Sequence, residues 1–185
     1  MLGTMIAFAL SRYRFRGRTT TNLLIFLPMA TPEVVLAASL LTLFLNFRVP
    51  LGFTTIVIAH VMFCISFVVV AVKARIAGLD PRLEQAASDL YANEFQTFRR
   101  ITLPLVAPGI AGAALLAFSL SFDDFIITNF VSGNVNTFPK FVYVSAGRGV
   151  PAQAYVIGSA MFILAMLIVL LVEAVRWRRE ATLKH

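Results

Sequence analysis

Charged residues are scarce in this sequence. Asp, Glu, Lys and Arg together make up 14% of its 185 residues, whereas a soluble domain of this size carries about a quarter. Mean hydropathy is +0.84, and 59% of the residues are hydrophobic. These values exclude an ordinary soluble domain and predict an integral membrane protein. The net charge of +7 does not by itself indicate a nucleic-acid partner, and we expect none.

Cysteine is nearly absent, and catalytic motifs are missing. The one cysteine, Cys64, lies in an apolar run, so no disulfide can form within the chain. The two histidines, His60 and His185, are far apart in sequence, and no metal-ligand spacing, Ser-His-Asp motif or GxxxxGK[ST] phosphate loop is present. We therefore expect no enzyme activity, metal or bound cofactor in this chain. His60, within an apolar run, is interpreted as a packed or hydrogen-bonded residue and not as a functional site.

Four apolar runs are long enough to cross a membrane, which takes about 20 helical residues. They are residues 23–45, 51–72, 102–131 and 154–172. The fold class predicted is all-α, a polytopic membrane helical bundle with four full spans plus a partial N-terminal helix, residues 2–10. Because basic residues follow that short helix instead of preceding it, it does not read as a secretory signal, and we expect a chain that is short at its N-terminus.

Local signals refine two of these regions. Pro28 and Pro32 lie inside the first run and predict a kink. In the segment 132–151, Pro139 is placed to start a short helix through Ala146, although a plain loop is the alternative.

The longest polar segment, residues 80–104, separates the second and third runs. Asp80 is placed to cap a helix that starts at Pro81. Asn93 followed by Gln96 indicates a second helix start of the capping-box kind. We predict two short helices with a break near residues 91–92, outside the membrane.

Basic residues predict the orientation, because they collect on the cytoplasmic side of membrane proteins. If the segment 80–104 is cytoplasmic, then the cluster 12–18 and the C-terminal tail are cytoplasmic too. Only three of the sixteen Lys and Arg residues, Arg48, Lys140 and Arg148, fall outside that side. The N-terminus is then expected outside the cell.

Three acidic residues lie within apolar runs, namely Glu33, Asp123 and Asp124. A carboxylate inside the bilayer is costly unless it is paired, hydrated or protonated, so such residues often line a path. These three would attract a cation. The structural alternative is that Glu33 satisfies backbone groups freed at Pro28 and Pro32, that Asp123 caps the next helix, and that Asp124 sits in outer water.

The polar segment resembles a known motif. Gln85-Ala86-Ala87, then Tyr91, then Ile101 and Leu103-Pro104 follow the spacing of the EAA loop of ABC importer permeases. Gln85 stands where that family has Glu, and Tyr91 stands where it has Gly. A Tyr residue has a steric cost at positive φ, a backbone conformation that Gly adopts freely. Five further stretches resemble, in order, the spermidine/putrescine ABC permeases: YRFRG at 13–17, PE at 32–33, LSFDDF at 120–125, NFVSG at 129–133 and GVP at 149–151.

The resemblance implies a fold, a function and partners. Residues 1–175 would form the transmembrane domain of a type I ABC importer, with 80–104 as its cytoplasmic coupling loop and 176–185 as a basic cytoplasmic tail. The chain would pair with a second permease, two ATPase subunits that bind ATP and Mg²⁺, and an extracytoplasmic solute-binding protein, in the plasma or inner membrane. It would translocate polyamines past Glu33, Asp123 and Asp124. The loop residues implied in coupling are Glu84, Gln85, Ala86, Ala87, Asp89, Leu90, Tyr91 and Ala92.

Alternatives remain open on the sequence. The chain could be an ABC permease for another small solute, or a secondary carrier driven by protons through its acidic residues. It could also be a fragment that inserts without assembling.

Overall fold

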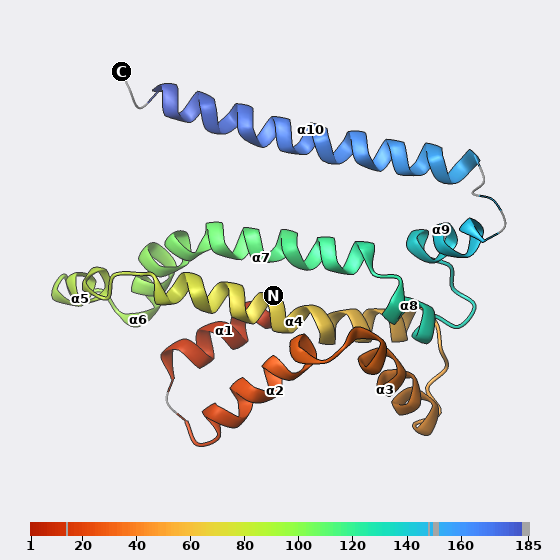
Figure 1. Cartoon of the computed structure of the whole chain (residues 1–185). Coiled ribbons are helices and arrows are strands. Elements are labelled where there is room, and N and C mark those ends of the chain that lie inside the picture. Colours follow the sequence, from red (N-terminus) through yellow and green to blue (C-terminus); the bar gives the residue numbers. More distant parts are fainter. Residues whose placement is uncertain (14, 148, 150–151, 183–185) are drawn as a thin grey trace. The chain divides into compact units, whose positions relative to one another are not determined.

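The computed structural model describes residues 1–13, 15–147, 149 and 152–182. Every regular element in these ranges is a helix (Figure 1). The chain divides into two compact units, residues 1–136 and residues 137–185. Each unit is described by itself.

Among its described residues, the first unit contains nine helical elements. They are α1 (Leu2–Arg12), α2 (Arg18–Ala30), α3 (Glu33–Asn46), α4 (Phe53–Ala77), α5 (Arg82–Asp89), α6 (Glu94–Thr97), the π-helical turn η1 (Phe98–Thr102), α7 (Leu103–Asp123) and α8 (Ile126–Val131). The second unit contains α9 (Phe138–Ala146) and α10 (Ala152–Thr182). The short helix predicted from Pro139 is therefore confirmed as α9.

Two helices in the described residues are long and apolar enough to cross a membrane. One is α4, with 25 residues, and the other is the continuous helical run Glu94–Asp123, with 30 residues. The pair α2 and α3 passes the same test only as a unit that bends by 109°. The count is thus two spans, or three if the bent pair is one span.

One predicted span needs a correction, and another is broken where two acidic residues interrupt it. Residues 23–45 do not form one helix, because the chain breaks between Ala30 and Glu33. Pro32 lies in that break, which confirms the predicted kink, whereas the helix continues through Pro28. The run 102–131 is interrupted in the sequence by Asp123 and Asp124, and the structure breaks there, since α7 stops at Asp123 and α8 follows as a separate piece. The fourth span, 154–172, stays a prediction, since the apolar helix recorded within α10 covers only Ala152–Leu164.

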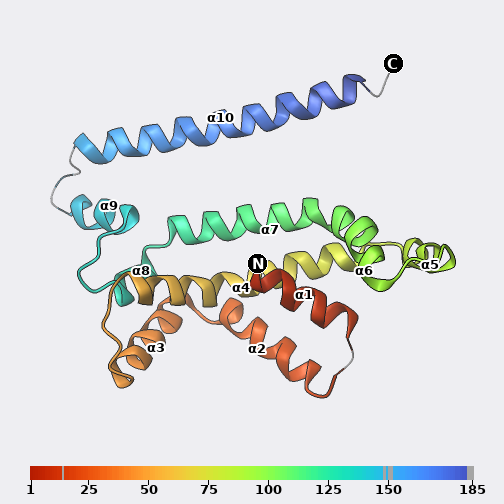
Figure 2. The same cartoon turned by 180° about the vertical axis from the view of Figure 1, so that it is seen from behind.

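Helix α4 is the central element of the first unit. It packs against α1, α2, α7 and α8, and both views show α7 running beside it (Figures 1 and 2). One hydrophobic cluster joins α3, α4 and α8 around the fully buried residues Ala37, Ala59 and Ile127. A second cluster joins α1, α4 and α7 around Ala7 and other small or branched residues. Buried alanines at these contacts allow close approach of the helix backbones.

The contact of α4 with α7 depends on a glycine. A Cβ added at Gly109 would lie 2.5 Å from Cγ of Arg75. The Arg75 stem is held there because its Nε and Nη2 atoms both donate to the Leu105 carbonyl oxygen, at 3.0 and 2.8 Å. No larger residue fits at position 109 without moving Arg75 or separating the two helices.

We predict that Gly109→Ala destabilises the protein by about 1–3 kcal/mol, the usual cost of overpacking. The matched control is Gly112→Ala on the same helix, where an added Cβ meets nothing within 4 Å. That control should be neutral or stabilising by up to about 1 kcal/mol, because Ala favours helix. The measurement is thermal unfolding in detergent. Unfolding exposes the buried thiol of Cys64, and the reaction of this thiol with a fluorescent reagent reports the unfolded fraction at each temperature. Equal unfolding midpoints for the two variants would contradict the packing argument.

Candidate functional site

The three acidic residues predicted inside the membrane lie where helices break. Glu33 is the first residue of α3, directly after the 109° bend. Asp123 is the last residue of α7, and Asp124 lies in the link to α8. Because α3 packs against α8, the two breaks come together, and the Glu33 side chain lies close to the Asp124 carboxyl.

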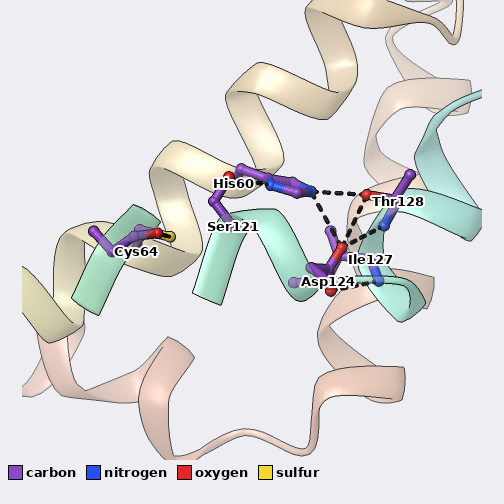
Figure 3. Close-up of polar contacts among 7 residues, drawn as sticks. His60, Cys64, Ser121, Asp124, Ile127 and Thr128 are labelled. Atoms are coloured by element: carbon purple, nitrogen blue, oxygen red, sulfur yellow. Dashed lines mark hydrogen bonds and ion pairs between the residues drawn. The ribbon is translucent and has the colours of Figure 1, made fainter. Parts of the chain in front are cut away.

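Asp124 is a buried helix cap. It is 7% exposed. One carboxylate oxygen accepts from the Ile127 N–H at 3.2 Å, and the other accepts from the Thr128 N–H at 2.8 Å and the Thr128 hydroxyl at 3.0 Å (Figure 3). These bonds satisfy free N–H groups at the start of α8. The structural alternative, in which Asp123 caps the next helix and Asp124 sits in outer water, is therefore wrong. Asp124 is the residue that caps α8, and it is buried.

His60 joins this arrangement from α4. Its Nε2 atom lies 3.1 Å from the Asp124 carboxylate and 2.9 Å from the Thr128 hydroxyl, and its Nδ1 atom lies 2.8 Å from the Ser121 hydroxyl (Figure 3). The imidazole thus connects α4, α7 and α8. The expectation that His60 is hydrogen-bonded within the bundle is confirmed. We call His60, Ser121, Asp124 and Thr128 the His60 cluster.

Sequence reasoning missed Ser121 and Thr128. Thr128 follows Asp124 by four residues and Ser121 precedes it by three, which are helical spacings. However, nothing local in the sequence indicates that His60, more than 60 residues earlier, binds both hydroxyls. Among the described residues, no group of three or more His, Cys, Asp and Glu side chains could hold a metal ion.

Asp123 differs from its neighbour. Its side chain is exposed, and within the described residues the structure records no hydrogen bond or ion pair for it. It lies close enough to the half-buried Glu33 for their charges to interact. Asp124 is thus satisfied inside the chain, whereas Asp123 and part of Glu33 can meet a ligand.

We predict that Asp124→Ala destabilises the fold strongly and Asp123→Ala does not. Loss of the α8 cap costs about 0.5–2 kcal/mol, and leaving the His60 and Thr128 groups without their partner adds about 1–3 kcal/mol. The Asp123→Ala control should stay within about 0.5 kcal/mol, as exposed substitutions usually do. The measurement is the thermal unfolding midpoint of the two variants, detected by the reaction of the Cys64 thiol. A large loss for both variants, or for neither, would contradict the assignment of the cap.

The polar loop forms the helices predicted for it. The Arg82 N–H donates to Oδ1 of Asp80 at 2.9 Å, so Asp80 caps a helix that begins at Arg82, one residue later than expected. Asn93 and Gln96 form the reciprocal capping box, with bonds of 3.1 and 2.8 Å. The predicted break at residues 91–92 is also confirmed.

Tyr91 makes that break with a left-handed backbone. Its φ is +58°, the conformation for which glycine is the usual residue. The turn is closed by the Ala92 N–H, which donates to the Ala87 carbonyl oxygen at 3.0 Å. The chain therefore keeps a sharp turn although Tyr stands where the resembling motif has Gly.

The residues of the loop divide into an inner and an outer set. Ala87 is buried, and Glu84 and Ala92 are half-buried. The exposed set consists of Gln85, Ala86, Asp89, Leu90 and Tyr91. The outer set is the surface that a partner could contact.

Glu84 fastens the loop to the helices. It forms an ion pair with Arg12 at the end of α1 and accepts from the Thr102 hydroxyl at 2.8 Å. Burial raises the pKa of Glu84, but the Arg12 and Thr102 hydrogen bonds and the Arg12 charge outweigh burial, so the pKa lies below its usual value. The contact also places the basic end of α1 beside the loop, as expected if both lie on one side of the membrane.

Comparison with known proteins adds an independent finding. Residues 1–177 match the family described as binding-protein-dependent transport system inner membrane component. The chain is 37% identical over 171 residues to the spermidine/putrescine transport system permease protein PotC of Escherichia coli strain K12, covering 92% of this chain and 65% of that protein. It is 40% identical over 158 residues to the putrescine transport system permease protein PotI of the same strain, covering 81% of this chain and 56% of that protein. It is 35% identical over 183 residues to the PotC homolog of Mycoplasma genitalium, covering 97% of this chain and 64% of that protein.

Proposed function

We propose, because the chain belongs to the family of binding-protein-dependent transport system inner membrane components, that it is a membrane subunit of an ATP-driven importer of polyamines. The observation that carries the proposal is the similarity to spermidine and putrescine permeases along most of this chain. The chain spans 65% of the length of the first of these relatives. Activity, solute and partners are therefore proposed for the complex in which this chain works.

The acidic residues supply the path for the cation in this proposal. Asp123 ends α7 and Glu33 begins α3, and the two carboxyl groups lie close enough for their charges to interact. A polyamine carries several ammonium groups, and an exposed carboxylate beside apolar helices lowers the cost of removing water from each of them. Asp124 has a different task, which is to hold α8 in place through the His60 cluster. The path residues proposed are thus Asp123 and Glu33, with Asp124 supporting them.

The polar loop supplies the connection to ATP hydrolysis. In the proposed mechanism, an ATPase subunit on the cytoplasmic side binds ATP and Mg²⁺ and moves α5 when it closes. Glu84 passes this motion to α1 through Arg12 and to η1 through Thr102. The helices then rock, and the cavity between this chain and a second permease turns from the outer to the inner side. A solute-binding protein delivers the polyamine from outside.

One observation favours a second candidate function. Asp124 lies 3.1 Å from His60, and Glu33 lies close to Asp124, so three titratable groups are neighbours. Such neighbours could carry protons, so a proton-coupled carrier is the alternative from another class. A permease for a different small solute is the alternative within the family.

The experiment that tests the proposal is purification of the tagged chain from membranes in mild detergent. The expected result is recovery with an ATPase subunit and a second permease, and ATP hydrolysis that the solute-loaded binding protein stimulates. Titration of that binding protein with spermidine, putrescine and unrelated solutes then identifies the solute. Purification of the chain without any ATPase would contradict the importer proposal.

A further inference from the structure

Two residues on either side of Asp123 bind the same imidazole ring. The hydroxyl of Ser121, in the last turn of α7, lies 2.8 Å from Nδ1 of His60, and the carboxylate of Asp124 lies 3.1 Å from Nε2 (Figure 3). Asp123 stands between them in the chain and is exposed. The ring therefore holds the chain on both sides of the exposed carboxylate.

The helix that supplies the ring is a fixed support. His60 lies in the interior of α4, which packs against α1, α2, α7 and α8, and its side chain is only 12% exposed. Helix α7, in contrast, ends at Asp123, and the backbone of Asp124 is extended, with φ −64° and ψ 117°. The helical ladder of backbone hydrogen bonds is interrupted at such a break. The His60 contacts therefore tie the break to the central helix.

The hydrogen bonds assign a proton to one of the two ring nitrogens. The Thr128 hydroxyl has one hydrogen, which it donates to the Asp124 carboxylate at 3.0 Å. Toward His60, the Thr128 oxygen can therefore only accept, and a carboxylate can also only accept. Both acceptors lie near Nε2, at 2.9 and 3.1 Å. Nε2 must therefore carry a hydrogen, and this N–H group binds the Asp124 side to α4.

We infer that His60 is a positioning residue for the cation path. Its Nε2–H group engages the Asp124 carboxylate and its Nδ1 atom holds Ser121, so that Asp123, and not Asp124, is presented to the polyamine. The inference rests on the proposed function and deepens it. Neighbouring Cα atoms are about 3.8 Å apart, so a shift of the Asp124 backbone moves Asp123 with it. In enzymes, a misplacement of about 1 Å costs up to about 100-fold in rate.

The test distinguishes the two ring nitrogens by amide substitutions at position 60. The amide nitrogen of Gln reaches the place of Nε2, whereas that of Asn reaches only the place of Nδ1. His60→Gln keeps a donor for Asp124 and should lower the initial rate of labelled spermidine uptake by less than about threefold. His60→Asn loses that donor and should lower the rate about tenfold, which corresponds to about 1.4 kcal/mol and is close to the worth of a hydrogen bond to a charged group.

Combination with Asp123→Asn distinguishes positioning from stability. In the wild-type background, Asp123→Asn is expected to lower uptake about tenfold. In His60→Asn the carboxylate is already displaced, so the same change should lower the remaining rate by less than about threefold. Such non-additivity measures the coupling between two residues. All rates are divided by the amount of complex in the membrane. A residue that only stabilises the fold would therefore leave the tenfold effect of Asp123→Asn unchanged.

The control is Ser119→Ala. Ser119 lies on α7 two residues before Ser121 and is exposed. This variant should keep wild-type uptake and the full effect of Asp123→Asn. If His60→Asn does not reach the membrane, Ser121→Ala takes its place in the combination, because it removes one hydroxyl and leaves the ring. Ser121→Ala alone should lower uptake about threefold, and the effect of Asp123→Asn should again be reduced.

The possible outcomes separate the inference from the proposed function. An equal loss on Asp123→Asn in the wild-type and His60→Asn backgrounds would overturn the inference, while the path role of Asp123 would stand. Equal uptake by His60→Gln and His60→Asn would overturn the assignment of the role to the Nε2–H group. If Asp123→Asn had no effect in the wild-type background, the path proposal itself would fail, and the inference would fail with it.

Discussion

Replacing Asp123 by Asn is expected to reduce polyamine uptake about tenfold, and replacing it by Lys to reduce uptake about 100-fold. Asp123 is exposed at the end of α7, and in the proposed function its carboxylate receives an ammonium group of the polyamine. A tenfold loss corresponds to about 1.4 kcal/mol, below the cost usually seen when one partner of a buried charge pair is removed. Lys has a larger effect because it repels the polycation. The measurement is the initial rate of labelled spermidine uptake into cells or proteoliposomes.

Asp123→Glu is the matched control for this prediction. It keeps the charge and moves it by one methylene, so uptake should stay within about threefold of wild type. The amount of protein in the membrane and the unfolding midpoint should be unchanged in all three variants, because Asp123 makes no recorded hydrogen bond in the described residues. Unaltered uptake kinetics in Asp123→Lys would rule out a path role for this residue.

Replacing Ala86 by Trp is expected to separate the ATPase from the complex and to abolish uptake. Ala86 is on the exposed side of α5, so a large side chain there obstructs a partner without disturbing the interior of the loop. Ala87 is the informative contrast, since it is 5% exposed. Ala87→Trp overpacks the loop and destabilises the protein by about 1–3 kcal/mol. Any loss of ATPase binding in this variant is therefore expected together with a lower unfolding midpoint. Co-purification, ATP hydrolysis and thermal unfolding are measured for both variants.

The control for bulk alone is Ala152→Trp. Ala152 is exposed at the start of α10 and lies outside the polar loop in sequence. This variant should keep its ATPase and its uptake rate. If Ala86→Trp also retained the ATPase at wild-type yield, α5 would not be the docking element.

Local sequence signals predicted the polar loop well. Asp80, Asn93 and Gln96 form their capping bonds with groups two or three residues away, so the sequence contains all the information that these contacts need. Pro32 ends a helix for an equally local reason, namely the missing N–H. Whether the chain bends slightly or by 109° at that point depends on the packing of α3 against α4 and α8, which no local pattern states.

The roles of the acidic residues could be predicted only in part. Hydropathy indicated that Glu33, Asp123 and Asp124 are unusual, but neighbouring residues on a helix point about 100° apart. Which of the two aspartates faces inward was decided by where α7 ends and α8 begins. His60 shows the same limit, because its partners Ser121 and Thr128 are brought to it by the packing of three helices.

Tyr91 was noticed for the opposite reason, as a departure from a motif. Tyr stands at the position where the motif has Gly, and a Tyr residue has a steric cost at positive φ. The structure keeps the left-handed backbone and accepts the steric cost. The identity of the residue alone could not show this, because the geometry of the turn is imposed by the helices on either side.

The source of energy for uptake tests the central proposal most directly. The complex is reconstituted into proteoliposomes with its ATPase subunits facing the lumen, and the binding protein is added outside. Uptake of labelled spermidine is measured with and without ATP in the lumen. Each measurement is made with the proton gradient intact and with it collapsed. The importer account predicts uptake that requires ATP and continues after the gradient is collapsed. Uptake that ignores ATP and stops with the gradient would contradict it, and would assign Glu33, Asp124 and His60 to a proton-coupled carrier.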